Sequence, residues 1–324
     1  MDKSKALKGA EIIIKNWIDA KSCDTMLIVT DKTHREEGIL LKETSEKLGC
    51  KTDIMVTQQD GILVGMYFDN NPEIFAGYDY IIGATDYSLV TTVAAKNAIK
   101  NGSGFLSLPL HTNDGRSMLE YNFLNCDIGK SKILAEKLIS KLHNATVIHA
   151  TTTRGTDMYF YKKDRHARFF SGCLKDSNGY SSASIEVYVP IEESRTHGRL
   201  ILDGSMGYIG KVNTPLQITF DKGRICEIEA TDDGVKLQKF IEDYQDEKMY
   251  VASEFGIGLN PLSRCDGNCY IEDESALGTF HIGFGRNLAL GGLWQAKGHF
   301  DLTTFDADIY ADGVLVMHKG QIII

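Results

Sequence analysis

Short apolar runs alternate with longer amphipathic stretches through the first half of the chain. The runs predict buried strands, because a few apolar residues between polar turns suit a sheet that is covered on both faces. The stretches between them repeat apolar residues every three or four positions, as helices do. The predicted strands are 26–29, 53–56, 80–83 and 105–107, and the predicted helices are 7–18, 35–48, 90–100 and 130–143. This alternation predicts a layered α/β domain with a mainly parallel sheet.

The pattern changes at His149 to short runs in which apolar and polar residues alternate. Such runs, separated by glycine-containing turns, predict an antiparallel β domain with one inserted helix. The predicted strands are 158–161, 185–189, 199–202, 216–220 and 225–228, and the helix is 237–244. We therefore expect an α/β domain over 1–147 and a mostly antiparallel β domain, carrying the chemistry, over 148–324.

Composition narrows the classes of partner. A net charge of −9 with no dense run of lysine and arginine argues against nucleic acid or an anionic membrane as the partner, and favours a small molecule or short peptide. No apolar run is long enough for a membrane span, and the first residues lack the apolar core of a signal peptide, so we expect a cytoplasmic protein. The seven cysteines are expected to be free thiols, because their number is odd and they are dispersed. Cys265 and Cys269 would suit zinc only with a second pair, which the neighbouring sequence lacks.

The densest group of metal-ligating residue types lies between Glu254 and Asp301. His299 and Asp301 are two positions apart, so on a strand both side chains point to one face and can hold one ion. Alone, such a pair more often faces solvent. His281 lies in a second glycine-rich segment, and Glu254 stands among apolar residues and glycines, where burial is costly unless the carboxylate is paired or bound to a metal. Glu186, between two apolar residues of a predicted strand, raises the same question more weakly.

These segments resemble a known family. The runs 253–261 (SEFGIGLNP), 273–285 (DESALGTFHIGFG) and 299–301 (HFD), together with 185–190 (IEVYVP), are similar to the metal-dependent aminopeptidases of the aminopeptidase T type, peptidase family M29. The resemblance covers most of the second half in the same order, whereas the first half is similar only in its α/β pattern. It implies a metal-dependent hydrolase, and a homodimer.

The resemblance also implies a set of site residues. The metal ligands would be Glu186, Glu254, His281, His299 and Asp301, a set that suits one or two divalent ions such as zinc, cobalt or manganese. Such ions activate a water that attacks an amide or peptide carbonyl. The catalytic residues would be Glu274, which moves the proton, and Glu254.

One departure from the family opens an alternative. Family M29 carries a tyrosine seven residues after the histidine matched by His281, and this chain has Leu288 there. A second similar enzyme, 2,5-dihydroxypyridine 5,6-dioxygenase, is a ring-cleaving enzyme with one non-haem Fe2+. It has histidine where this chain has Glu254, and a rearranged triad of His281, His299 and Asp301 would be needed to hold the iron. A third hypothesis is an inactive homologue that binds a metal or ligand.

Other features of the sequence are weaker candidates. The strand end at 83–86 and His111 would lie near a cleft if the first sheet binds a ligand at the carboxyl ends of its strands, although a plain loop is the more common case. Arg154, Arg165 and Arg195 would suit an anionic substrate, but scattered arginines are usually solvated. No glycine-rich phosphate motif follows a predicted strand, so we expect no nucleotide cofactor.

Overall fold

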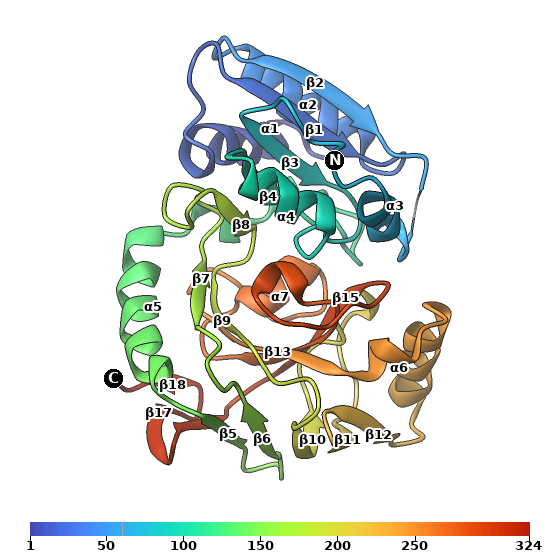
Figure 1. Cartoon of the computed structure of the whole chain (residues 1–324), viewed down its shortest axis with the longest axis vertical. Helices are drawn as coiled ribbons and strands as arrows, with labels where there is room; N and C mark the ends of the chain where they lie inside the picture. Colours follow the sequence, from blue (N-terminus) through green and yellow to red (C-terminus); the bar gives the residue numbers. More distant parts are fainter. Residues whose placement is uncertain (60) are drawn as a thin grey trace.

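The computed structural model describes residues 1–59 and 61–324, and their helices and strands form two units, one above the other (Figure 1). The first unit is built on a parallel sheet with strand order β2-β1-β3-β4-β8. Its elements are α1 (Lys3–Ile12), the π-helix η1 (Ile13–Trp17), β1 (Thr25–Thr30), α2 (Arg35–Glu46), β2 (Lys51–Val56), α3 (Val64–Asn70), β3 (Tyr80–Ala84), α4 (Val93–Lys100), β4 (Gly104–Ser107), η2 (Met118–Glu120), η3 (Asn122–Asn125) and β8 (Tyr180–Ser182).

Alternation along the parallel strands explains why helices cover both faces of this sheet. In β1, Met26 and Ile28 pack into the core that contains α1 and Leu41 of α2, while Leu27 and Val29 pack with Val64 of α3 and with α4. Both faces are apolar, as continuous hydrophobic runs require. The predicted α/β domain with a parallel sheet is confirmed.

The second unit contains two antiparallel sheets packed face to face. Its elements are α5 (Ile128–His143), β5 (Val147–Thr151), β6 (Asp157–Tyr161), β7 (Arg168–Phe170), β9 (Glu186–Pro190), β10 (His197–Leu202), η4 (Gly207–Ile209), β11 (Leu216–Asp221), β12 (Arg224–Ile228), α6 (Asp232–Asp243), η5 (Glu247–Tyr250), β13 (Ala252–Gly258), α7 (Tyr270–Ser275), β14 (Phe280–Gly285), η6 (Leu288–Leu290), β15 (His299–Thr304), β16 (Asp308–Ala311), β17 (Val314–His318) and β18 (Gln321–Ile322).

One sheet has strand order β12-β11-β10-β6-β5-β16-β17-β18, and the other has β15-β14-β13-β9-β7. Aromatic rings join them: Phe160 of β6 lies 5.1 Å from Phe255 of β13, and Phe220 of β11 lies 5.9 Å from Phe284 of β14, between ring centroids. The core therefore lies between the two sheets. The predicted antiparallel β domain is confirmed.

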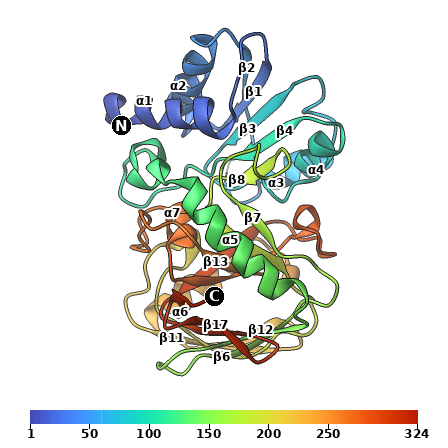
Figure 2. The same ribbon diagram turned by 90° about the vertical axis from the view of Figure 1, so that its left-hand side faces the viewer.

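Two segments depart from a simple division at residue 147. The helix predicted over 130–143 to close the first domain forms as α5, but it packs against β7 and β9, across the outside of the second unit (Figure 2). Strand β8, far beyond residue 147, pairs with β4 and completes the first sheet. The chain thus returns to the first unit, and the boundary between 1–147 and 148–324 stays a prediction.

Candidate metal centre

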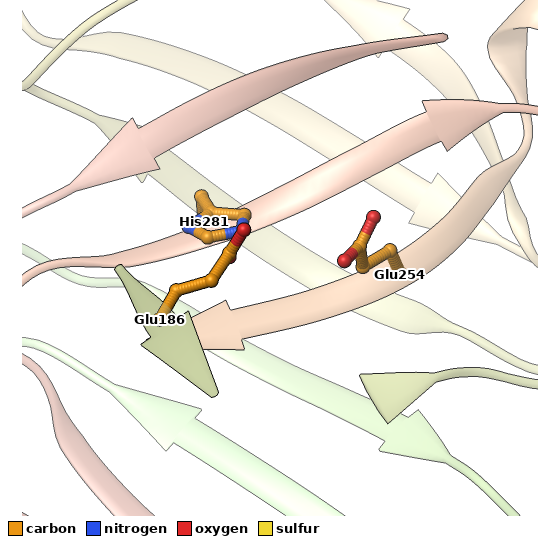
Figure 3. A group of neighbouring side chains, drawn as sticks. All are labelled: Glu186, Glu254 and His281. Atoms are coloured by element: carbon orange, nitrogen blue, oxygen red, sulfur yellow. The ribbon is translucent and has the colours of Figure 1, made fainter. Parts of the chain in front are cut away.

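All five predicted metal ligands lie on one face of the five-stranded antiparallel sheet of the second unit. Glu186 is on β9, Glu254 on β13, His281 on β14, and His299 and Asp301 on β15. Side chains alternate between the two faces of a strand. The strand register pairs each ligand with a residue of the neighbouring strand that points to the same face as that strand's own ligand. Figure 3 shows the carboxylate of Glu186 beside the ring of His281, with Glu254 on the strand between them. The opposite face carries apolar residues, including Val187, Phe255, Ile282 and Phe300, that pack into the core.

Glycines on the same face make room for these side chains. A Cβ atom at Gly256 would lie 2.0 Å from His281 Nε2, and one at Gly283 would lie 2.8 Å from the Cβ of Glu254 and 2.9 Å from Asp301 Oδ1. Each glycine therefore leaves the space that a ligand fills from the next strand. This is the physical reason for the glycine-rich segments around Glu254 and His281, in which glycine alternates with large apolar residues.

The ligands form two groups that share Glu254. Glu186, Glu254 and His281 make one, and Glu254, His299 and Asp301 make the other; within each group the donor atoms lie within 4.8 Å of one another. His281 Nε2 is 2.7 Å from Glu186 Oε2, and His299 Nε2 is 3.1 Å from Glu254 Oε2 and 3.4 Å from Asp301 Oδ1. The triad of His281, His299 and Asp301 is not one of the groups found among the described residues, so the prediction that these three would hold iron together is not supported by the geometry.

The donor set fits a divalent cation. Four buried carboxylates, those of Glu186, Glu254, Glu274 and Asp301, face only two imidazoles. Within residues 1–59 and 61–324, no hydrogen-bond partner is found for Glu274 Oε2 or His281 Nδ1, and for Glu186 Oε2 and Asp301 Oδ1 none is found besides the imidazoles of His281 and His299. Buried charges and unpaired polar atoms are costly, and a metal ion among these oxygens and nitrogens would satisfy them. Carboxylate and imidazole donors suit zinc, manganese, cobalt or ferrous iron.

Three further contacts orient the ligands, and the sequence did not reveal them. The Ser184 hydroxyl donates to Glu186 Oε1 at 2.6 Å, and the hydroxyl of Tyr270 on α7 donates to Asp301 Oδ2. His299 Nδ1 lies 3.0 Å from the carbonyl oxygen of Arg286, so its N–H donates there and Nε2 is left for a metal. Ser184 stands two residues before Glu186, a spacing that could have suggested the contact, whereas only tertiary packing brings Tyr270 to Asp301.

Burial and the charges of neighbouring side chains strongly shift the pKa values of these residues. Burial raises the pKa of Glu254 to about 7, and raises that of Glu274 well above its usual range with help from the Asp301 charge. Burial alone would lower the pKa of both histidines. The Glu186 carboxylate nevertheless raises the pKa of His281 to about 9, and Asp301 raises that of His299 to about 10. For Asp301, His299 outweighs the effect of burial and lowers the pKa to about 2.

The site is enclosed between the two units. Its cavity is about 20 Å³, close to the space of one water molecule, and Ser88 and Val90 of the first unit line it together with the ligands. Glu274 on α7 also lines it, with its unpaired Oε2. Leu288, at the position of the family M29 tyrosine, is partly exposed in η6, and Leu290 lines the cavity instead. The phenol that lines the cavity is Tyr270.

The weaker candidates have structural roles. His111 contacts Asp86 Oδ1 through Nδ1 at 3.1 Å and the carbonyl oxygen of Tyr208 through Nε2 at 2.9 Å, so it joins the two units without lining the cavity. Asp86 itself does not line the cavity, although Ser88, two residues on, does. Cys265 and Cys269 are free thiols outside both donor groups.

The three arginines considered for an anionic substrate are all paired. Each forms an ion pair with a carboxylate: Arg154 with Asp203 at 2.9 Å, Arg165 with Glu193 at 2.7 Å, and Arg195 with Glu192 at 3.2 Å. In the part of the chain that the structure describes, no helix has both the length and the apolar character needed to cross a membrane.

The fold and the donor groups define an α/β and antiparallel β scaffold with a candidate metal site. Comparison with known proteins gives its family. A family model described as NicX, 2,5-dihydroxypyridine 5,6-dioxygenase, matches residues 128–324, so the chain belongs to that family. A curated relative, 2,5-dihydroxypyridine 5,6-dioxygenase of Pseudomonas putida, is 25% identical over 148 residues, 40% of this chain and 41% of the relative. The chain therefore matches less than half the length of that relative.

Solved structures show that the whole fold is shared. The structure of 2,5-dihydroxypyridine dioxygenase from Pseudomonas putida KT2440 aligns with 100% of this chain and 98% of its own, with a TM-score of 0.76 and 16% identity. Wild-type AmpT from Thermus thermophilus aligns over 100% of both chains, with a TM-score of 0.63 and 15% identity. The predicted scaffold, common to aminopeptidase T and the dioxygenase, is confirmed, and the likeness extends to the first half. These relatives are enzymes of two different reaction types.

Proposed function

We propose that this protein is a hydrolase that uses two divalent metal ions to cleave an amide or peptide bond in a small substrate. The observation that carries the proposal is the pair of donor groups joined by Glu254. Three carboxylates and two imidazoles are more donor groups than one ion needs if it must also leave a position for the substrate. Glu254 belongs to both groups, so it would help to hold both ions.

The residues around the ligands fit this chemistry. Two divalent ions held by these groups would supply Lewis-acid activation of a carbonyl and of a water molecule. Glu274 Oε2 has no hydrogen-bond partner among the described residues and lines the cavity, so we assign Glu274 the transfer of a proton at this oxygen. Hydrogen bonds from Tyr270 to Asp301 and from His299 to the carbonyl oxygen of Arg286 would keep both ligands in their orientation while the substrate reacts. Glu254 acts as the shared ligand.

A ring-cleaving dioxygenase with one ferrous ion is the second candidate. The family to which the chain belongs and the curated relative both carry that name, which favours it. The group of Glu254, His299 and Asp301 would be the iron site, with one histidine and two carboxylates. Glu186 and His281 would then have no direct role, although both are buried and converge on Glu254.

Metal content separates the two candidates. Protein purified without chelator or added metal, and then reconstituted, is expected to bind two zinc, manganese or cobalt ions per chain and to release product from dipeptides or amino acid anilides. One iron per chain, with oxygen uptake on 2,5-dihydroxypyridine, would replace this proposal by the dioxygenase. Protein that cannot be reconstituted with any of these metals would favour an inactive homologue.

A single substitution sharpens the same test. Glu186 belongs to only one donor group, so Glu186→Gln should lower the metal content from two ions per chain to about one. The matched control is Glu272→Gln, which changes a buried carboxylate on α7 outside both groups and should leave the content unchanged. Metal content that is the same in the wild type and in Glu186→Gln would contradict a two-ion centre.

Partners and location stay predictions from the sequence. We expect a homodimer in the cytoplasm that binds a small molecule or short peptide, with neither nucleic acid nor membrane as a partner. Light scattering during size-exclusion chromatography tests the dimer.

A further inference from the structure

A second, much larger cavity lies beside the metal centre. Its volume is about 560 Å³, against about 20 Å³ at the ligands, and Phe170 lines both. Ala289 lines the large cavity, and Leu290, the next residue of η6, lines the small one. A space of one water molecule cannot hold an organic substrate, whereas the larger cavity has the size of an ordinary ligand site.

The sheet register places an arginine of this cavity in line with the metal ligands. On β7, Phe170 pairs with Glu186 of β9, and Arg168 pairs with Tyr188. Paired residues and those two positions apart share a face, so Arg168, Phe170 and Tyr188 lie on the ligand face of the sheet. Two residues of strand span about 7 Å, so the backbone of Arg168 lies about that far along the strand from the position opposite Glu186.

Arg168 is the cation of this cavity that is best placed to bind an anion. It is exposed, and no carboxylate of the described residues forms an ion pair with it. Lys132, by contrast, is paired with Asp176 at 2.7 Å. The remaining charged residues that line the cavity are Lys96 and Glu136. The cavity therefore carries a net positive charge, and a guanidinium suits a carboxylate because it can donate two parallel hydrogen bonds.

Aromatic rings form the wall between Arg168 and the ligands. Phe170 stacks on Tyr188 with centroids 4.2 Å apart, and meets Tyr180 edge to face at 5.5 Å. The Tyr180 hydroxyl is bonded to the carbonyl oxygen of Val90, so this wall is anchored to the first unit. The wall offers an apolar surface to the part of a ligand that lies between a carboxylate on Arg168 and a bond at the metals.

We propose that the large cavity binds the part of the substrate remote from the reacting bond, with Arg168 receiving a carboxylate and Phe170 contacting an adjoining apolar group. The substrate is thus a small carboxylate-bearing molecule, of the size of a dipeptide or an N-acylamino acid. The identity of the reacting bond rests on the proposed hydrolase function, but the carboxylate site does not. Arg168 would be a specificity-determining residue.

The test compares two probes that differ only at their terminal group. N-benzoylglycine carries a carboxylate, and N-benzoylglycinamide carries an uncharged amide in its place. Calorimetric titration of the full-length protein, as purified and again after chelator treatment, separates binding at Arg168 from binding at a metal. The carboxylate probe should bind more tightly than the amide in both forms, and Arg168→Gln should weaken it about tenfold to hundredfold, the loss of one charged hydrogen-bonding contact.

Controls distinguish a specific site from a general charge effect. Arg195→Gln removes a cation that pairs with Glu192 away from the cavity, and should change neither affinity. Arg168→Lys keeps the charge and should recover part of the affinity. Equal binding of the two probes by the wild type, or unchanged binding in Arg168→Gln, would overturn the inference. Arg168-dependent binding without any hydrolysis would retain the carboxylate site and reject the hydrolase.

Discussion

The parallel sheet of the first unit and the five-stranded sheet that carries the candidate metal site in the second unit are built on opposite principles. The parallel sheet of the first unit is apolar on both faces and is covered by helices. The five-stranded sheet of the second unit is apolar on one face and carries five ionisable ligands on the other, all of them buried. The parallel sheet is therefore stabilised by hydrophobic burial on both faces, whereas the second sheet has one face of buried charge that needs a counter-ion.

Of the changes that test this difference between the two units, the removal of one ligand should have the largest effect. His299→Ala is expected to lose most bound metal and nearly all activity while keeping the fold, because His299 belongs to the group with Glu254 and Asp301. Elemental analysis and circular dichroism measure the two properties. His111→Ala, in the first unit, should keep its metal, since His111 contacts Asp86 and Tyr208. Undiminished metal in His299→Ala would reject the site.

Metal affinity should fall steeply as the pH is lowered. The pKa values of about 9 for His281 and about 10 for His299 mean that both are protonated near neutral pH without metal. Binding must displace these protons, so the affinity should rise with pH up to about 9 to 10, by about tenfold per pH unit for each proton displaced. Titrations between pH 6 and 9, in buffers of different ionisation enthalpy, count the protons. An affinity that is constant over this range would contradict the protonated apo site.

A methyl group between the ligand strands should disturb the site. Gly256→Ala would place a Cβ 2.0 Å from His281 Nε2, so we expect weaker metal binding and a loss of about 1–3 kcal/mol in the free energy of unfolding. The control is Gly129→Ala in α5, where the nearest atom is 3.3 Å away; it should be neutral or stabilising by up to about 1 kcal/mol. Denaturant unfolding and metal titration check both. Wild-type metal affinity in Gly256→Ala would show that the glycine is not needed.

The first unit should show a smaller pH dependence that does not involve metal. Burial lowers the pKa of His34, but hydrogen bonds with Asp86 and Glu37 outweigh it and raise the pKa to about 9. Stability from a raised pKa is present below the unfolded value of about 6.5 and is lost as the pH rises through 9. The free energy of unfolding of the wild type should exceed that of His34→Gln by about 1–2 kcal/mol near pH 6 and by less at pH 9. A stability difference that does not vary with pH would refute this role, and chelator should not change the result.

Much of the secondary structure was predictable, because the residues that form the core are the apolar residues of the local sequence pattern. The strands of the first sheet were visible as apolar runs, and α5 as a repeat of leucines. The packing of α5 on β7 and β9, and the return of β8 to the first sheet, were not, because both depend on contacts between residues far apart in the chain.

The sequence by itself determined the residue types of the candidate metal site and their common face. Alternation in IEVYV, SEFGIG, FHIGFG and HFD places Glu186, Glu254, His281, His299 and Asp301 on one side of their strands, with glycines on the same side of the strands of Glu254 and His281. Only the tertiary structure decided how these ligands are grouped, because register and packing set which side chains meet. That packing joined the two groups at Glu254, brought the Tyr270 hydroxyl to Asp301, and left Arg168, an arginine without signal in the sequence, in the cavity beside them.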